Sequence, residues 1–581
     1  MSEEEPGAAP DGVEEGKRLI RLGGQSGLSL AERLSERFDR LTWRTPLHRL
    51  RLRGRYPLKL IAVPDDPLAG DIARGEAMLD GRMSYRGESH DLATLDFAAR
   101  GQGDKAWGRA FAAHVHGFAW LRDLSTVATR AQGAPIAEAL TASWLKAYAD
   151  KVDALAWAPE HWGRRLLFWT AHAPLILSST NLVYRSAVLN TLARGARHLD
   201  RGADKAAVGA PRIAAWCGLA AAGLLIPGGE PRRAFAEAGL ARALATGMFE
   251  DGGAVSRSPA ALLDTIGLLT MLRETYAARR LDLPEPAAAA LGRAVPALLG
   301  VVHADRGLAS WQGGGPVGAD EVAAVIAATG IRTRPLRQSR DWGYQRLAAG
   351  SAVLIVDAAP PPVARAMHAG CASTLAFELS DGPARLVVNC GGARAGLAGL
   401  PPALIQGLRT TAAHSTLVLG DSNSTAVQAD GTLGRGVVQV ELSRQESEAA
   451  SRLEASHDGY VRRWGFLHRR QLQLAGDGRE LRGEDALLPQ GRRRAGPTGF
   501  AIRFHLGAGV QASPTADGQA ALLRLPGGAL WQFRCRGGAL AIESSLWIDA
   551  GGRAVPTQQL VVSGEAAAGG ASVSWAFKRA I

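Results

Sequence analysis

The chain has few cysteines for its length, and their spacing excludes two classes of small structural site. Four occur in 581 residues, at Cys217, Cys371, Cys390 and Cys535, and no two form a C-x-x-C pair. A zinc knuckle and a disulfide framework both need closely or regularly spaced cysteines, so neither is expected. Free cysteine is usually buried, which favours small buried thiols. Cys371 and Cys390 lie near a histidine in the sequence, so a metal or redox role stays open for them.

The chain also lacks an apolar run long enough to span a bilayer, so no transmembrane helix is expected. It begins Ser2-Glu3-Glu4-Glu5, without a basic stretch followed by an apolar one, so no secretory signal is visible. Residues 2–16 are predicted to form a solvated acidic tail. On these grounds alone the protein would be cytoplasmic.

Positive charge is in excess, but it is spread along the chain. The formal net charge is +12. Most basic residues are arginines, which suit bidentate pairing with carboxylate, sulfate or phosphate. Dispersed positive charge indicates an acidic partner only weakly, and it also follows from an Ala-, Gly- and Arg-rich composition. No helix-turn-helix, zinc finger or aromatic stacking platform accompanies it, so a nucleic-acid partner is not expected. The oligomeric state is left open.

The first half of the chain has a helical pattern. Between Trp107 and Leu124, apolar and aromatic residues recur at steps of three or four, as on one face of a helix. Similar Ala/Leu-rich segments follow up to about residue 330, separated by Gly and Pro. Seven or more helices with short connections predict stacked helical hairpins, and no strict repeat is visible.

After about residue 335 the period changes from 3.6 to 2. Many short strand-like runs follow, separated by turn pairs such as Asp381-Gly382 and Asp477-Gly478. This spacing predicts an antiparallel β-sandwich. The predicted parts are residues 1–85, an acidic tail and irregular segment; residues 86–335, a helical domain; and residues 336–581, the sandwich. The active cleft is expected between the two large domains, because ligand sites favour domain interfaces.

Two histidines each start a strand-like run beside small residues. They occur in Met367-His368-Ala369-Gly370 and in Ala413-His414-Ser415-Thr416. Imidazoles at the mouths of neighbouring strands can hold a metal or move a proton. We therefore expect His368 and His414 to lie close together, at the end of the sandwich that faces the helical domain.

Further motifs accompany these histidines. In the strand region they are Ser456-His457-Asp458-Gly459-Tyr460, His468-Arg469-Arg470, Gly483-Glu484-Asp485 and Arg503-Phe504-His505-Leu506. In the helical half, Asp251-Gly252-Gly253 is followed by Ser258-Pro259. Over residues 90 to 510 this pattern resembles the heparinase II/III-like family of polysaccharide lyases.

The resemblance implies an α+β multidomain fold, with an N-terminal (α/α) toroid followed by a C-terminal antiparallel β-sandwich. It also implies β-elimination on an acidic, uronic-acid-containing polysaccharide or oligosaccharide, such as a glycosaminoglycan or alginate. Such lyases are mostly found in the periplasm or cell envelope, which conflicts with the absence of a visible signal.

The chemistry of β-elimination assigns roles to residues of this chain. The C5 carboxylate must be neutralised, a base must take the C5 proton, and an acid must protonate the leaving oxygen. The candidates are Asn181 or Arg257 as neutraliser, His368 as base, and Tyr460 or Tyr184 as acid.

Each of these residues also has a structural interpretation. Asn181 follows Ser178-Ser179-Thr180 and would act as a helix cap. Arg257 would be a surface cation and Tyr460 a packing residue. His368 would be a hydrogen-bonded structural histidine.

The remaining polar residues of the motifs complete the expected site. His414 would be a second catalytic imidazole or a metal ligand, and Arg409, His457 and Arg469 would contact substrate. No cofactor is required. A structural zinc ion would use His368 and His414, with His457 or His468 as further ligands. Where metal-binding family members carry an aspartate, this chain has Asn389, a poorer ligand.

One departure from the family bears directly on activity. Catalytic members carry Tyr and His shortly after the Ser-Pro of the helical motif, whereas this chain has Ala261 and Leu262. Two functions therefore stay open. The protein is a polysaccharide lyase with another acid or base, or it is a non-catalytic or divergent carbohydrate-binding or assembly protein on the same scaffold.

Overall fold

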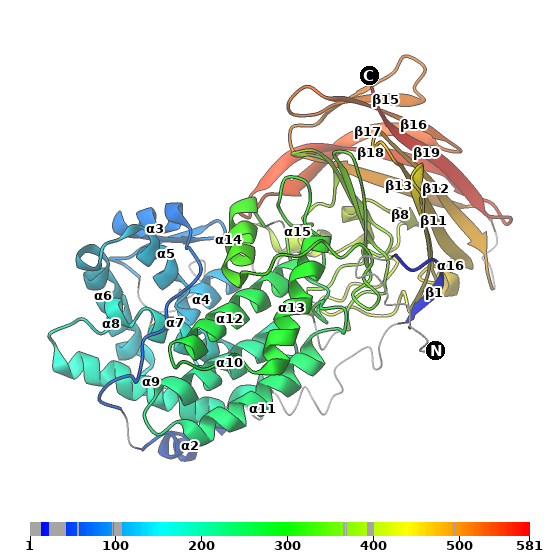
Figure 1. Ribbon diagram of the computed structural model, residues 1–581. Helices are drawn as coiled ribbons and strands as arrows, with labels where there is room; N and C mark the ends of the chain where they lie inside the picture. Colours follow the sequence, from blue (N-terminus) through cyan, green and yellow to red (C-terminus); the bar gives the residue numbers. More distant parts are fainter. Residues whose placement is uncertain are drawn as a thin grey trace, which may run out of the picture.

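The computed structural model describes residues 13–21, 42–43, 45–54, 57–95, 97, 107–315, 317–363, 367, 369–391, 400–491 and 496–580. Helices form the N-terminal half and two large antiparallel sheets form the C-terminal half (Figure 1). This is the (α/α) toroid followed by an antiparallel β-sandwich that the sequence predicted.

The toroid is built from successive helices joined by short connections. Several begin with proline in the first two helical positions, where the missing N–H costs nothing. No helix in the described part of the chain is long and apolar enough to cross a membrane. The helices are α4 (Arg109–Gly117), α5 (Trp120–Val127), α6 (Arg130–Tyr148), α7 (Pro159–Ala171), α8 (Ala173–Ile176), α9 (Leu182–Gly202), α10 (Ala210–Leu225), α11 (Glu230–Gly247), α12 (Pro259–Ala277), α13 (Glu285–Gly300) and α14 (Ala319–Thr329).

Helix α10 is the centre of the toroid. Nearly all of its residues are buried, as expected for a helix that is apolar all round. It packs against α7 so closely that a Cβ on Gly163 would lie 2.0 Å from the carbonyl oxygen of Ala214, and one on Gly218 would meet the backbone of Gly163. The two glycines therefore set the distance between these helices.

Two sheets form the sandwich, and their strands pair antiparallel throughout. The nine-stranded sheet has the order β1 (Gly16–Arg21), β9 (Gln439–Glu446), β10 (Ala450–His457), β11 (Phe466–Ala475), β12 (Glu480–Pro489), β19 (Ala571–Arg579), β16 (Leu530–Arg536), β15 (Ala520–Arg524) and β14 (Gln511–Pro514). The eight-stranded sheet has the order β17 (Ala539–Ile548), β18 (Ala554–Ala566), β13 (Thr498–Leu506), β7 (Ala384–Val388), β6 (Phe377–Asp381), β5 (Ala352–Asp357) and β4 (Tyr344–Ala349), and β8 (Leu417–Leu419) pairs with β13.

The sandwich core is aromatic at its centre, where Phe377 stacks on Trp575 and Phe504 packs edge-on against it. Strand β11 shows the alternation that produces this core, because every second residue from Phe466 to Leu474 is buried. The inward set of β11 includes His468 and Arg470. The core therefore contains charged and polar groups that must be paired.

The N-terminal segment expected to be irregular contains regular elements in its described part. Strand β1 forms the edge of the nine-stranded sheet by pairing with β9, more than 400 positions away in sequence. Helices α2 (Pro46–Arg51) and α3 (Ile72–Leu79) and strand β2 (Arg82–Tyr85), which pairs with β3 (Glu88–Asp91), also lie there. The distant partner of β1 leaves no local signal, and the prediction of an irregular segment was wrong for the residues of all these elements. Most of the predicted acidic tail, residues 2–12, lies outside the described residues.

Candidate functional site

The turn that carries Arg257 leads into α12 at the boundary between the toroid and the sandwich. An isolated bridge between Met248 and Ala254 closes the turn. Ser258 then caps the helix by accepting from the backbone N–H of Ala261. Arg257 itself has a φ of 55°, in the left-handed region that few side chains adopt. The strained backbone directs this side chain toward the sandwich.

Arg257 is buried, and its guanidinium is hydrogen-bonded within the protein. Its side chain donates to Asp357 at 2.6 Å and to the backbone oxygens of Trp342, Ala359 and Pro360 at 2.8, 3.2 and 2.9 Å. Only 3% of the residue is exposed. Burial disfavours its charged form, but Asp357 outweighs this and raises the pKa of Arg257. These contacts hold the two domains together and occupy four of the five N–H groups of the side chain.

Asp357 completes this link from the sandwich side. Its second oxygen accepts from the hydroxyl of Ser373 at 2.6 Å and from the amide of Gln312 at 3.4 Å. Gln312 also accepts from the backbone N–H of Cys371 at 2.8 Å. The aspartate therefore joins a toroid arginine to two loops of the interface.

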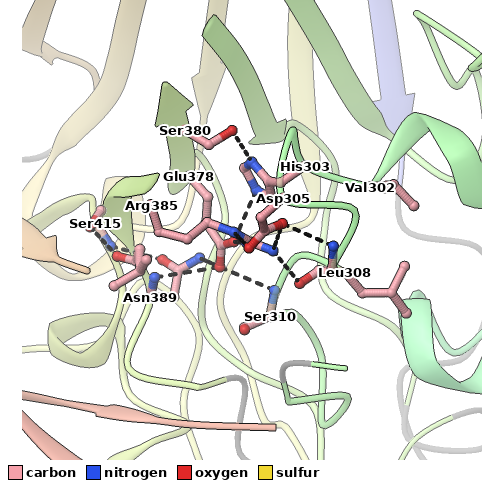
Figure 2. A network of polar contacts seen from close by, with 12 residues as sticks. Val302, His303, Asp305, Leu308, Ser310, Glu378, Ser380, Arg385, Asn389 and Ser415 are labelled. Carbon is pink, nitrogen blue, oxygen red and sulfur yellow. Dashed lines mark hydrogen bonds and ion pairs between the residues drawn. The ribbon is translucent and has the colours of Figure 1, made fainter. Parts of the chain in front are cut away.

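A second buried network centres on Glu378, the second residue of β6 (Figure 2). One carboxylate oxygen accepts from the backbone N–H of Ser310 at 3.1 Å and from the side-chain amide of Asn389 at 3.0 Å. The other contacts His303 and Arg385, each at 3.2 Å. Burial opposes ionisation of Glu378, but these partners hold its pKa below the usual value.

His303 reaches Glu378 from the toroid, just after α13. Its other ring nitrogen lies 3.0 Å from the hydroxyl of Ser380. Burial, and then the nearby Arg385, lower the pKa of His303 to about 4, so the ring is neutral at pH 7. Arg385 also pairs with Asp305 through two contacts of 2.7 and 2.8 Å. The network therefore crosses the domain boundary in several places.

Asn389, compared in the sequence with an aspartate metal ligand, has both ends of its amide occupied. The amide nitrogen donates to Glu378, and the oxygen accepts from the backbone N–H of Ser415 at 3.0 Å. Among the described residues, no group of three or more His, Cys, Asp or Glu is placed to hold a metal ion.

His414 is buried beside this network. Its Nδ1 contacts the backbone oxygen of Thr410 at 2.7 Å, so Nδ1 carries the proton and Nε2 is an acceptor. Nε2 has no hydrogen-bond partner among the described residues. Burial lowers the pKa of His414. Its predicted partner, His368, lies outside the described residues, so a shared site for the two histidines stays a prediction.

His457 and His468 form a buried chain within the nine-stranded sheet. The backbone N–H of Gly459 donates to His457, whose other nitrogen lies 3.2 Å from His468. His468 in turn contacts Asp485 at 2.7 Å, and Asp485 also accepts from Arg470 at 2.8 and 2.9 Å. All four side chains face the sandwich core, so the predicted substrate contact by His457 has no support in this geometry.

Tyr460, Arg409 and Arg469 also have partners within the protein. Tyr460 is 1% exposed and donates to the backbone oxygen of Leu417 at 2.8 Å. Arg409 is buried and donates to the backbone oxygens of Gly370 and Gly431 at 3.0 and 2.9 Å. Arg469 is half-buried on the opposite face of its strand from His468 and Arg470, near Glu484. These three residues therefore do not meet in one site.

Asn181 and Tyr184 lie at the start of α9. Asn181 is exposed and caps the helix, accepting from the backbone N–H of Tyr184 at 3.1 Å. The capping interpretation of Asn181 is confirmed. Tyr184 is half-buried, and burial raises the pKa of its hydroxyl. Among the candidates that the structure describes, Asn181 is exposed, Tyr184 and Arg469 are half-buried, and the others are buried.

The residues that join the domains were not singled out from the sequence as a group. Glu378 and Asp357 sit in otherwise apolar strand runs, where a buried carboxylate requires a partner. That pattern was a usable signal for a buried ion pair. It gave no indication of the partners, because Arg257 and His303 are 100 and 75 positions away.

Comparison with known proteins agrees with this architecture. The family described as heparinase II/III-like, C-terminal, matches residues 331–576. A heparinase III crystal structure aligns over 96% of this chain and 93% of its own, with a TM-score of 0.68 and 13% identity. Heparan sulfate lyase HepC from Pedobacter heparinus aligns over 92% and 87%, with a TM-score of 0.56 and 13% identity.

A full-length relative is more similar in sequence. FtsZ-localized protein C from Caulobacter vibrioides is 30% identical over 568 residues, which is 92% of this chain and 92% of that protein. Domain order, motifs and this full-length match agree. The chain belongs to the heparinase II/III-like family.

Proposed function

We propose that this protein is a binding and localisation protein on the heparinase fold, which associates with FtsZ and does not depolymerise a polysaccharide. The observation that carries the proposal is the state of Arg257. Asp357 and backbone oxygens take four of its five N–H groups and the residue is 3% exposed, so turning it toward a substrate carboxylate would break the buried pair with Asp357 at the domain boundary.

Several other positions support the same conclusion. Ala261 and Leu262 replace the expected Tyr-His pair, and Leu262 is fully buried. Tyr460 would need to release its bond to Leu417 before it could protonate a leaving oxygen. Asn389 replaces a carboxylate metal ligand and is held at both ends. A general acid or base must reach the proton that it transfers, and these side chains face the protein interior.

The link to FtsZ comes from the relative. The name of this relative describes a protein localised with FtsZ, and the match extends over both domains of this chain. A shared binding function is more economical than a shared lyase activity, because binding does not require the residues that this chain has replaced.

A polysaccharide lyase acting on an acidic, uronic-acid-containing glycan is the second candidate. One observation favours it: Asn181 is exposed at the start of α9. In that mechanism Asn181 would neutralise the carboxylate, His368 would act as base, and Tyr184 would act as acid.

Two assays on the purified full-length protein separate the candidates. Uronate polymers are screened for the ultraviolet-absorbing double bond that elimination creates, and the protein is sedimented with and without polymerised FtsZ. We expect no unsaturated product, together with co-sedimentation that depends on FtsZ polymer. Unsaturated product that disappears in His368→Ala would establish the lyase, and absence from the FtsZ pellet would contradict the proposed partner.

A further inference from the structure

The outer face of the nine-stranded sheet carries a hollow of about 1400 Å³, away from the boundary between the domains. We call it the outer groove. Strands β1, β9, β10, β11, β12, β19 and β16 all contribute to it. Its polar lining includes Lys17, Ser443, Gln445, Arg452, Glu454, Gln471, Gln473, Arg482, Glu484, Arg534, Arg536 and Ser574.

The strand register arranges part of this lining in one straight row across the sheet. Arg452 on β10 is opposite Gln473 on β11, which is opposite Arg482 on β12. Arg482 is opposite Ala576 on β19, which is opposite Arg534 on β16. An arginine therefore occurs on every second strand. Neighbouring strands lie about 4.8 Å apart, so successive arginines repeat at about 9.6 Å.

These arginines are available, unlike those at the domain boundary. Each is exposed. Arg482 pairs with Glu480 at 2.9 Å but keeps 65% of its side chain exposed, and Arg534 lies near the exposed Asp517. Within the described chain, Arg452 makes no ion pair. The row therefore presents guanidinium groups with free donors to an anionic ligand.

Two acidic residues of the groove, Glu454 and Glu484, belong to the neighbouring row and already have partners, and a third, Asp517, lies near Arg534 at the end of the row. Glu454 accepts from Gln471, the residue opposite it on β11. Glu484 accepts from Arg469 at 3.4 Å. These contacts partly neutralise the two carboxylates within the sheet. The arginine row contains no carboxylate between Arg452 and Arg534.

The spacing of the row matches one peptide conformation. A polyproline II helix has three residues per turn and rises 3.1 Å per residue, so every third side chain projects from the same side at about 9.3 Å. Acidic side chains at every third position would meet Arg452, Arg482 and Arg534 in turn. The intervening Gln473 can pair with the solvated backbone of such a peptide.

The lining also favours a peptide over a glycan. Its one aromatic residue, Trp575, is 3% exposed and faces the core, so the groove offers no ring on which a sugar could stack. Backbone N–H and C=O groups in the middle of the sheet are already paired, so recognition depends on side chains.

From the register and this chemistry, we propose that the outer groove binds an acidic segment of a partner protein in polyproline II conformation, with a carboxylate at every third residue. The site is separate from the family's interdomain cleft, and the inference does not depend on which protein supplies the segment.

The test uses the full chain and fluorescent synthetic peptides. A repeating Glu-Pro-Pro peptide that spans the row is compared by fluorescence anisotropy with a peptide of equal length and charge whose glutamates occupy adjacent positions. We expect the Glu-Pro-Pro repeat to bind at least tenfold more tightly, with affinity falling as salt is raised. Equal affinity for the two peptides would overturn the match in spacing.

The row itself is tested by replacement. The variant Arg452→Gln, Arg482→Gln, Arg534→Gln should lose at least tenfold in affinity for the repeat. A matched control, Arg332→Gln, Arg462→Gln, Arg553→Gln, removes three exposed arginines elsewhere and should bind as the wild type does. Equal losses in both variants would reduce the effect to net charge and overturn the site. Binding of polyglucuronate but not of the peptide would assign the groove to a glycan, and binding of neither would also overturn the proposal.

Discussion

Arginine has opposite uses at the domain boundary and on the outer face of the nine-stranded sheet. At the boundary Arg257 and Arg385 are buried, and carboxylates and backbone oxygens take four of the five N–H groups of each. On the outer face Arg452 and Arg534 stand in solvent. The arginines at the domain boundary thus stabilise the fold, whereas exposed arginines lie on the outer face. The predictions below test this contrast, from the largest effect to the smallest.

The strongest contrast lies between two neighbours on β12. Asp485 is buried and bonded to His468, Arg470 and Trp575, whereas Glu484 points to the outer groove. Asp485→Ala leaves a buried arginine without its partner and should lower the free energy of unfolding by about 3–5 kcal/mol. Glu484→Ala should change it by less than about 0.5 kcal/mol. Denaturant titration measures both, and similar losses would contradict the assignment of inner and outer faces.

The main effect of Arg257→Ala should be a loss of stability. It leaves Asp357 buried without its cation, which typically costs about 3 kcal/mol or more. The matched control is Arg340→Ala, because the Arg340 side chain is 61% exposed and should cost little. Thermal unfolding of both variants gives the comparison. A stable Arg257→Ala protein that had lost activity on a uronate polymer would restore the catalytic role.

The boundary network should make the protein sensitive to acid. The pKa of His303 is about 4 in the folded state and 6.5 in a free side chain. Between these values the unfolded chain binds a proton that the folded chain does not, so stability falls as the pH drops, by about 1.4 kcal/mol per pH unit from this residue. Above pH 6.5 this contribution is constant.

His303→Gln tests the source of that slope. Glutamine can still donate to Glu378 but does not titrate. Denaturant titrations at several pH values between 4 and 7.5 should show a shallower dependence in the variant than in the wild type. Parallel curves would mean that His303 does not contribute to the acid sensitivity.

Asn181 offers a smaller and separable effect. Asn181→Ala removes the cap of α9 and should cost about 1 kcal/mol. Asn181→Ser keeps a capping oxygen and should recover most of that loss, as measured by thermal unfolding. A serine variant as unstable as the alanine variant would show that the side chain does more than cap the helix.

The outer row should matter least for stability. Replacing Arg452, Arg482 and Arg534 by Gln should change the free energy of unfolding by less than about 0.5 kcal/mol for each residue, because exposed side chains contribute little. A large loss in a denaturant titration would mean that the row holds the sheet together and would weaken its assignment to a partner.

Much of the architecture was predictable because it depends on local periodicity. The change from a 3.6-residue to a 2-residue pattern near residue 335 corresponds to the change from α14 to β4. Capping by Asn181 was also foreseen, because a cap uses groups only three residues apart. By contrast, β1 depends on β9, and no local pattern announces a partner so distant.

The candidate site was less predictable because residue type does not determine exposure. Asn181, Arg257 and Tyr460 were proposed from their chemistry and motif positions, and the structure leaves one of them, Asn181, open to solvent. Arg257 is drawn inside by Asp357, and Tyr460 by a backbone oxygen of a neighbouring strand. Such partners are set by how the domains meet.

The sequence by itself determined the order of helices and strands and the resemblance to a lyase family, because periodicity and motifs are local properties. Tertiary structure decided which polar residues are buried and paired within the fold and which are exposed to solvent. On β12, alternation places Glu484 and Asp485 on opposite faces, but both are acidic, so the pattern does not say which one is inside. The packing of the second sheet decides it, because a carboxylate is stable in the core only where Arg470 and His468 meet it.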